Sequence, residues 1–164
     1  MSSTRGLRVL KAIEHYVKTK PDRFDTMNIF NKMELSSPSN GHLRGSFTVD
    51  SSMCNCVNAM HGGYITALVD TFAAYAYVCD EKGKLAWTTS MHVNFLKSAL
   101  KGEKVTIEAY PLKSGNQPVM EAIIRNEAGN VLVKGTVSMQ AGQGTIQEMA
   151  KAVFQFDFDE KSKL

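Results

Sequence analysis

The sequence predicts an α+β fold in which an antiparallel β-sheet packs around one long central α-helix. Two observations support this fold class. The first is residues 62–79, an alanine-rich stretch whose only charged residue is Asp70, which predicts a long helix enclosed by the rest of the chain. The second is a series of strand-like segments after this helix, separated by short turns that contain glycine or asparagine.

Three elements are expected before the central helix. Residues 7–18 should form a helix that ends before Pro21, because apolar residues recur there at near-helical spacing. Residues 36–41 have the composition of a loop. Residues 43–50 alternate between inward and outward types, which predicts a half-buried strand. The apolar positions of the first helix are Leu7, Leu10, Ile13 and Val17.

Four further strands are expected after the central helix, at residues 87–96, 103–110, 119–126 and 131–139. The turns between them are short, which predicts an antiparallel meander. The first of these strands alternates strictly, so each of its faces should carry its own set of side chains. One face carries Thr89, Met91, Val93 and Phe95, and the other carries Thr88, Ser90, His92 and Asn94.

The chain divides into one domain with an extension at each end. Residues 1–40 are expected to supply an N-terminal helix and loop, residues 41–141 the sheet and central helix, and residues 142–164 a C-terminal extension. The extension contains Phe154, Phe156 and Phe158 in alternation with polar residues. This pattern fits an extra strand, a segment laid on a partner subunit, or a tail, and the sequence leaves the three open.

Composition excludes several classes of function. The net charge of +3 is too small to indicate a nucleic-acid partner. No apolar run reaches the roughly 18 residues of a membrane span. The three cysteines are expected to be free thiols in a reducing compartment, and their spacing does not indicate a metal site. We expect a cytoplasmic protein, with a mitochondrial location as the alternative because the first helix is basic and amphipathic.

The residues that bear chemistry gather at the start of the central helix. The first N–H groups of a helix lack intrahelical partners, and this end of the helix is electropositive. Gly62 and Gly63 would leave these amides unobstructed, so the segment that follows His61 can hold the oxyanion of an acyl-transfer reaction. Asp70 is a lone carboxylate on the same helix, and it is either a catalytic base or a structural cap for a neighbouring segment.

These residues resemble the hotdog-fold thioesterases. The resemblance rests on Asn55, the His61-Gly62-Gly63 motif that begins six residues later, Asp70 nine residues after the histidine, and the strand that begins at Thr88. It covers residues 43–140, and the phenylacetate-degradation and acyl-CoA thioesterase 13 branch is the most similar. The resemblance implies a hotdog fold and an acyl-CoA thioesterase that cleaves fatty or aromatic acyl-CoA.

The resemblance also implies a role for each position. Gly63, helped by Gly62, would polarise the thioester carbonyl through backbone N–H groups. Asp70 would be the general base or nucleophile, Asn55 would orient the carbonyl or water, and Thr88 would hold the water. His61 would touch the carbonyl, or would only fix the loop. Coenzyme A would contact Phe95, Leu96, Lys97, Ser98, Ala99, Leu100, Lys113, Ser114, Gly115, Asn116, Gln117 and Pro118.

No cofactor and no metal are expected, since coenzyme A is part of the substrate and product. The resemblance implies a homo-oligomer, namely a dimer with shared active sites that pairs into a tetramer. Apolar pocket walls are expected from Tyr64, Leu68, Phe72 and Met91. Two alternatives stay open: a non-catalytic acyl-CoA-binding protein, which would not need Asp70, and a hotdog enoyl-CoA hydratase, against which the residues before the central helix argue.

Overall fold

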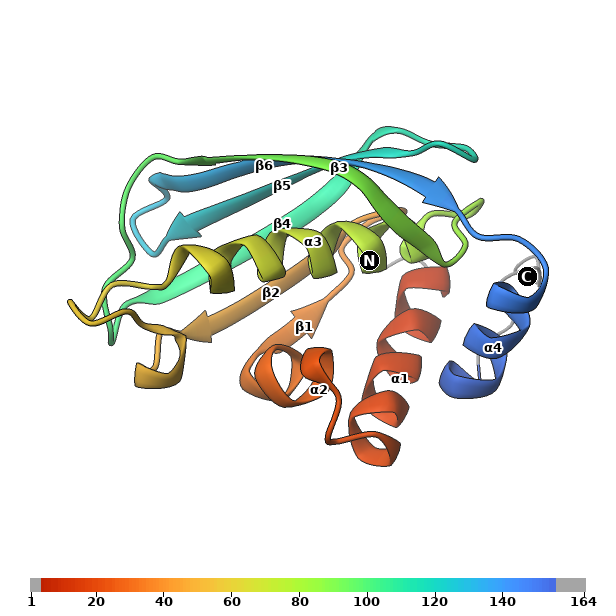
Figure 1. Ribbon diagram of the computed structural model, residues 1–164, viewed down its shortest axis with the longest axis horizontal. Coiled ribbons are helices and arrows are strands. Elements are labelled where there is room, and N and C mark those ends of the chain that lie inside the picture. The colour runs from red at the N-terminus through yellow and green to blue at the C-terminus, as the bar shows by residue number, and fades with distance from the viewer. Residues whose placement is uncertain (1–3, 156–164) are drawn as a thin grey trace.

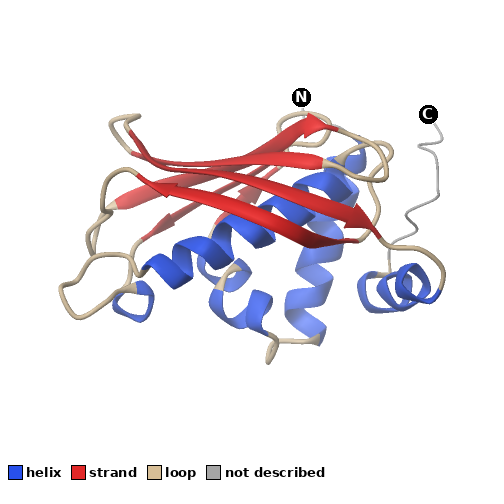
Figure 2. Cartoon of the chain, turned by 45° about the horizontal axis from the view of Figure 1, so that its top comes forward, coloured by secondary structure: helices blue, strands red, loops and turns tan. Residues whose placement is uncertain are grey.

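The computed structural model describes residues 4–155 as one antiparallel sheet with helices on one side (Figures 1 and 2). This arrangement confirms the α+β fold class, and the central helix has the predicted bounds. The chain runs through α1 (Thr4–Thr19), α2 (Phe24–Asn28), a 3-10 turn (Phe30–Lys32), β1 (Glu34–Ser36), β2 (Leu43–Thr48), a second 3-10 turn (Ser51–Met53), α3 (Gly62–Cys79), β3 (Ala86–Phe95), β4 (Lys104–Lys113), β5 (Val119–Asn126), β6 (Val131–Ala141) and α4 (Thr145–Phe154).

The strand order is β1-β2-β4-β5-β6-β3, with every neighbouring pair antiparallel. The expected meander of four strands is therefore correct only for β4, β5 and β6. β3 pairs with β6 instead of β4, because the connection from residue 96 to residue 103 carries the chain across α3 to the other half of the sheet. As a result β3 is an edge strand, with β6 as its only strand neighbour in residues 4–155.

Two glycines let α3 lie close against the sheet. A Cβ atom on Gly135 would lie 2.5 Å from the Cγ1 atom of Val69, and one on Gly45 would lie 2.5 Å from the Cζ atom of Phe72. Both distances are far below an ordinary contact, so a larger residue at either position would push the helix away. The close approach buries Leu68, Val69 and Phe72 completely.

The side of α3 that faces away from the sheet is covered over its C-terminal half by α1 and α4 (Figure 1). Arg5 of α1 is buried, and its Nε atom donates a hydrogen bond to the Val78 carbonyl at 2.9 Å. Its remaining nitrogens donate to the carbonyls of Glu81 and Gly83. Arg5 thus satisfies carbonyls at the end of α3 that have no partner within that helix.

The C-terminal extension forms a helix up to Phe154, so this part of it is not the extra strand that was one of the three expected forms. Phe156 and Phe158 lie outside the described residues. Gln147 fixes the start of α4, because its Nε2 atom donates to the carbonyls of Leu85 and Gly142, each at 2.8 Å. No helix within residues 4–155 combines the length and the hydropathy that a membrane crossing requires.

Candidate active site

The loop that leads into α3 is held by hydrogen bonds that its backbone N–H groups donate. The Oδ1 atom of Asn55 accepts from the N–H groups of Val57 at 3.0 Å and Ala59 at 3.1 Å. The N–H of Met60 donates to the Ala99 carbonyl at 2.8 Å, which ties this loop to the segment after β3. The Nδ2 group of Asn55 donates no hydrogen bond within residues 4–155, so this half-buried amide is free to bind a ligand oxygen.

His61 is the N-cap of α3. Its Nδ1 atom accepts from the N–H of Gly63 at 2.9 Å, and its carbonyl accepts from the N–H of Ile65 at 3.0 Å. Among the described residues, the N–H groups of Gly62 and Tyr64 have no acceptor. The amide of Gly63, expected to be the main donor to a thioester carbonyl, thus already has a partner, and Gly62 offers the open amide.

Asp70 and Thr88 form the second part of the site. The hydroxyl of Thr88 donates to the Oδ1 atom of Asp70, which joins β3 to the middle of α3. The Asp70 side chain is half-buried, and its Oδ2 atom accepts no hydrogen bond from the described residues. One carboxylate oxygen is therefore oriented by the protein, and the other is available to a water molecule.

A β-bulge explains how Thr88 reaches Asp70. The pairing of β3 with β6 shifts between Thr88 and Ser90, where one extra residue enters β3. Thr88 then pairs with buried Met139, and Met91 pairs with buried Val137, so both side chains of β3 face α3. The expectation from strict alternation, which placed Thr88 on the opposite face from Met91, is wrong because the bulge reverses the alternation.

A second carboxylate, which no sequence motif predicted, lies near Asp70. Asp25 of α2 is half-buried, and burial together with the negative charge of Asp70 raises the pKa of the Asp25 carboxyl. The neighbouring 3-10 turn packs on α3 through an edge-on ring contact between Phe30 and Tyr75, with ring centroids 4.7 Å apart. No motif surrounds Asp25, so only the tertiary packing reveals its position.

The residues expected to contact coenzyme A separate into two groups. The segment from Phe95 to Leu100 lies beside the start of α3, since a Cβ atom on Gly62 would lie 3.7 Å from the Phe95 ring. The segment from Lys113 to Pro118 lies at the other end of α3, where the hydroxyl of Ser114 donates to Asp80 at 2.7 Å. The 18 residues of α3 separate these two ends by roughly 27 Å.

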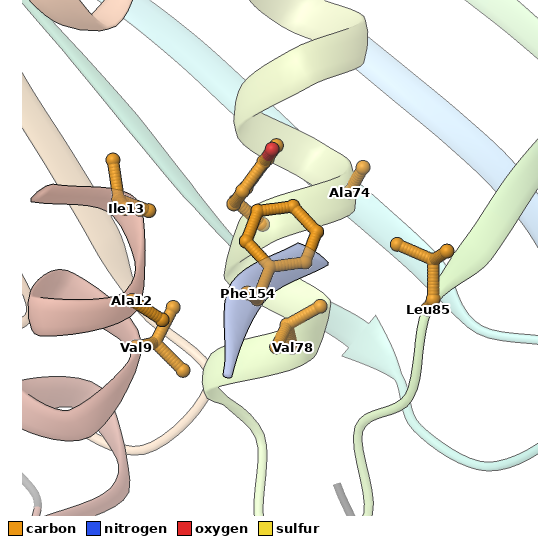
Figure 3. A pocket seen from close by; sticks show the side chains of 8 residues that line it. Val9, Ala12, Ile13, Ala74, Val78, Leu85 and Phe154 are labelled. Atoms are coloured by element: carbon orange, nitrogen blue, oxygen red, sulfur yellow. The ribbon is translucent and has the colours of Figure 1, made fainter. Parts of the chain in front are cut away.

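The expected pocket walls stay a prediction. Two of them, Leu68 and Phe72, are fully buried. A cavity lies on the side of α3 that faces away from the sheet, between α1, α3 and α4 (Figure 3). Its walls are Val9, Ala12, Ile13, Ala74, Tyr75, Val78, Leu85 and Phe154.

The chain is similar in sequence to known thioesterases. The model of the thioesterase superfamily matches residues 58–133, which contain His61, Asp70 and Thr88. Human acyl-coenzyme A thioesterase 13 is 28% identical over 144 residues, covering 86% of this chain and 98% of that protein.

Solved structures show the same fold. Thioesterase superfamily member 2 from zebra fish has a TM-score of 0.73 and 25% identity, over 81% of this chain and 96% of its own. A hypothetical thioesterase from Streptococcus pneumoniae, solved with coenzyme A, has a TM-score of 0.63 and 25% identity, over 69% of this chain and 94% of its own. In its hotdog fold and in part of its sequence, the chain is therefore similar to the thioesterase superfamily.

Proposed function

We propose that this protein is an acyl-CoA thioesterase, which hydrolyses a fatty or aromatic acyl-CoA to the free acid and coenzyme A. The observation that carries the proposal is the hydrogen bond from Thr88 to Asp70. It orients one carboxylate oxygen of Asp70, and the other accepts no hydrogen bond from the described residues. The similarity to human acyl-coenzyme A thioesterase 13 and to a thioesterase solved with coenzyme A supports this substrate class.

In the proposed mechanism, Asp70 is the general base. Its Oδ2 atom takes a proton from a water molecule, and the water oxygen forms a bond to the thioester carbon. The negative carbonyl oxygen is stabilised by the N–H of Gly62 and by the free side-chain amide of Asn55. The carbonyl then re-forms, the carbon–sulfur bond breaks, and the thiolate of coenzyme A leaves and takes up a proton. In the alternative mechanism, Asp70 attacks the carbonyl carbon directly.

The spacing along α3 requires two subunits in this mechanism. Gly62 and Asp70 are eight residues apart, which corresponds to about 12 Å along the helix axis, so one thioester carbonyl cannot contact both within a single chain. Edge strand β3 can pair antiparallel with β3 of a second copy. A two-fold axis would set the two α3 helices antiparallel, with Gly62 of one copy toward Asp70 of the other. We therefore propose a dimer with shared sites, which can pair further into a tetramer.

In the same dimer, the two segments expected to contact coenzyme A can bind one coenzyme A molecule together. In an antiparallel pair, the Phe95–Leu100 segment of one copy lies near the end of α3 at which the other copy carries Lys113 and Ser114. Lys113 is exposed and has no ion pair among the described residues, so it is available to a phosphate group. The compartment stays a prediction, with the cytoplasm first and the mitochondrion as the alternative.

Asp70→Asn tests the function. This variant keeps the shape of the side chain and removes the base, so we expect kcat/KM for acyl-CoA hydrolysis to fall by about 100-fold or more. Hydrolysis is measured by release of the coenzyme A thiol, with Asp22→Asn at an exposed position as the control. Full activity in Asp70→Asn would refute catalysis by this residue and would favour the non-catalytic acyl-CoA-binding alternative.

A single turnover in water enriched in heavy oxygen separates the two mechanisms. If Asp70 attacks directly, a mixed anhydride forms, and when water then attacks its Asp70 carbon, heavy oxygen enters the enzyme carboxylate and the released acid carries an unlabelled oxygen from Asp70. If Asp70 activates water, the heavy oxygen appears only in the released acid.

A further inference from the structure

The cavity between α1, α3 and α4 begins one helical turn from Asp70, the proposed catalytic residue. Ala74 is part of its wall and follows Asp70 by four residues, so the two side chains lie on the same face of α3, one turn apart. The shift along the helix axis is about 6 Å. Ala67 and Ala74, on either side of Asp70 along α3, are both small and half-buried.

The lining of the cavity suits a hydrocarbon chain. Seven of its eight lining residues are apolar, and the eighth, Tyr75, presents its ring. Burial raises the pKa of Tyr75, so its hydroxyl stays uncharged at neutral pH. The unfilled space, open solvent included, is about 360 Å³, and only a small part of it is enclosed. A cavity lined in this way offers no partner for a charged or strongly polar group, and it gains free energy by burying methylene groups.

The C-terminal helix supplies the outer wall. The ring of Phe154 covers the cavity and contacts Tyr16 of α1 and Tyr75 of α3, with centroids 4.8 and 5.9 Å away (Figure 3). At the other end of α4, Gln147 is pinned by its hydrogen bonds to Leu85 and Gly142. The start of α4 is therefore fixed by polar contacts, whereas its end is held against the cavity by aromatic contacts.

We propose that this cavity receives the far end of the acyl chain, with Phe154 as its closing wall, and that the enzyme consequently prefers fatty acyl thioesters over acetyl and aryl thioesters. The inference rests on the proposed function, because it takes the thioester to be held at Asp70. A chain that passes Ala74 buries additional methylene groups. Each buried methylene should raise kcat/KM by about fourfold until the cavity is filled.

The test measures kcat/KM for acetyl-, octanoyl-, dodecanoyl-, palmitoyl- and phenylacetyl-CoA. We expect kcat/KM to rise from acetyl to a fatty acyl optimum. In Ala12→Leu, three added carbons fill the cavity from the α1 side, so the ratio of dodecanoyl to acetyl kcat/KM should fall at least tenfold. In Phe154→Ala the wall recedes, so the optimum should move to a longer chain; this variant changes a half-buried side chain at the end of a helix and keeps the test valid if Ala12→Leu does not fold.

Met149→Ala is the matched control, because Met149 lies on the exposed face of α4 and is 65% exposed. Its chain-length profile should match that of the parent protein. A parent enzyme that hydrolyses acyl-CoA, with a profile that neither cavity variant alters, would overturn the acyl-chain assignment and leave the thioesterase function intact. A parent protein that hydrolyses no thioester in the series would overturn both.

Discussion

The two ends of α3 differ in how they are built. At its start, Asn55, His61 and Gly62 belong to one short segment, and backbone hydrogen bonds fix their positions. At its end, the surroundings come from distant parts of the chain: Arg5 and Ala12 of α1 and the whole of α4. The comparison teaches that a local segment carries the polar groups proposed to bind the thioester carbonyl, whereas the two extensions build the apolar surroundings proposed for the acyl chain.

The largest effect is expected at the start of the helix, from Gly62→Pro. Proline has no N–H, but it fits the first position of a helix, and His61 before it is already extended. The fold should therefore persist, while kcat/KM falls by about 100-fold to 1,000-fold because a carbonyl donor is lost.

Gly62→Ala is the control for that variant. It keeps the N–H, and the added Cβ atom would lie 3.7 Å from the Phe95 ring, an ordinary contact. If proline and alanine reduce kcat/KM equally, then Gly63 or Tyr64 supplies the donor and the assignment to Gly62 is wrong.

At the opposite end, Arg5→Met should change stability rather than chemistry. The variant keeps an apolar stem and removes the donors to the carbonyls of Val78, Glu81 and Gly83. We expect the free energy of unfolding to fall by about 2–3 kcal/mol, measured by urea denaturation. Lys11→Met, at an exposed position of the same helix, should change it little. A loss of kcat in Arg5→Met without loss of stability would contradict this comparison, because it would mean that Arg5, at the end of α3, contributes to the chemistry.

A smaller effect is expected from Thr88→Val, which removes the hydroxyl from Asp70 and keeps the side-chain shape. One hydrogen bond to a charged group should contribute about tenfold to kcat. Thr88→Ser, which retains the hydroxyl, should keep most of the activity. If valine is as active as serine at this position, the hydroxyl orients neither the carboxylate nor the water.

The smallest effect is expected from Asp25→Asn, which tests the repulsion between Asp25 and Asp70, midway between the two ends of α3. Because the pKa of Asp25 is raised in the folded protein, the folded state binds its proton more tightly than the unfolded chain does. The stabilisation from this proton is complete below the usual pKa of aspartate and disappears as pH rises through the raised value. The neutral amide should therefore increase Tm by about 1–2 °C at pH 7, and not below about pH 4. An equal change at both pH values would exclude a charge effect.

Most of the residues proposed for the chemistry could be predicted from the sequence, because they are close together in it. The bounds of α3, the N-terminal position of the glycine motif and the lone charge of Asp70 all follow from local pattern. The assignment of Thr88 followed only from the family resemblance, since simple alternation placed it on the wrong face. An inserted residue reverses every later position of a strand, and the pattern of a single strand does not reveal it.

By itself, the sequence determined the fold class, the central helix and the segment that gives that helix its exposed amides, because helix propensity, glycine geometry and apolar periodicity act over a few residues. Only the tertiary structure decided that β3 crosses to β6 and that Phe154 closes a cavity one turn from Asp70. Each of these depends on contacts between residues far apart in the chain, whose free energy is set by packing in three dimensions and not by local preference.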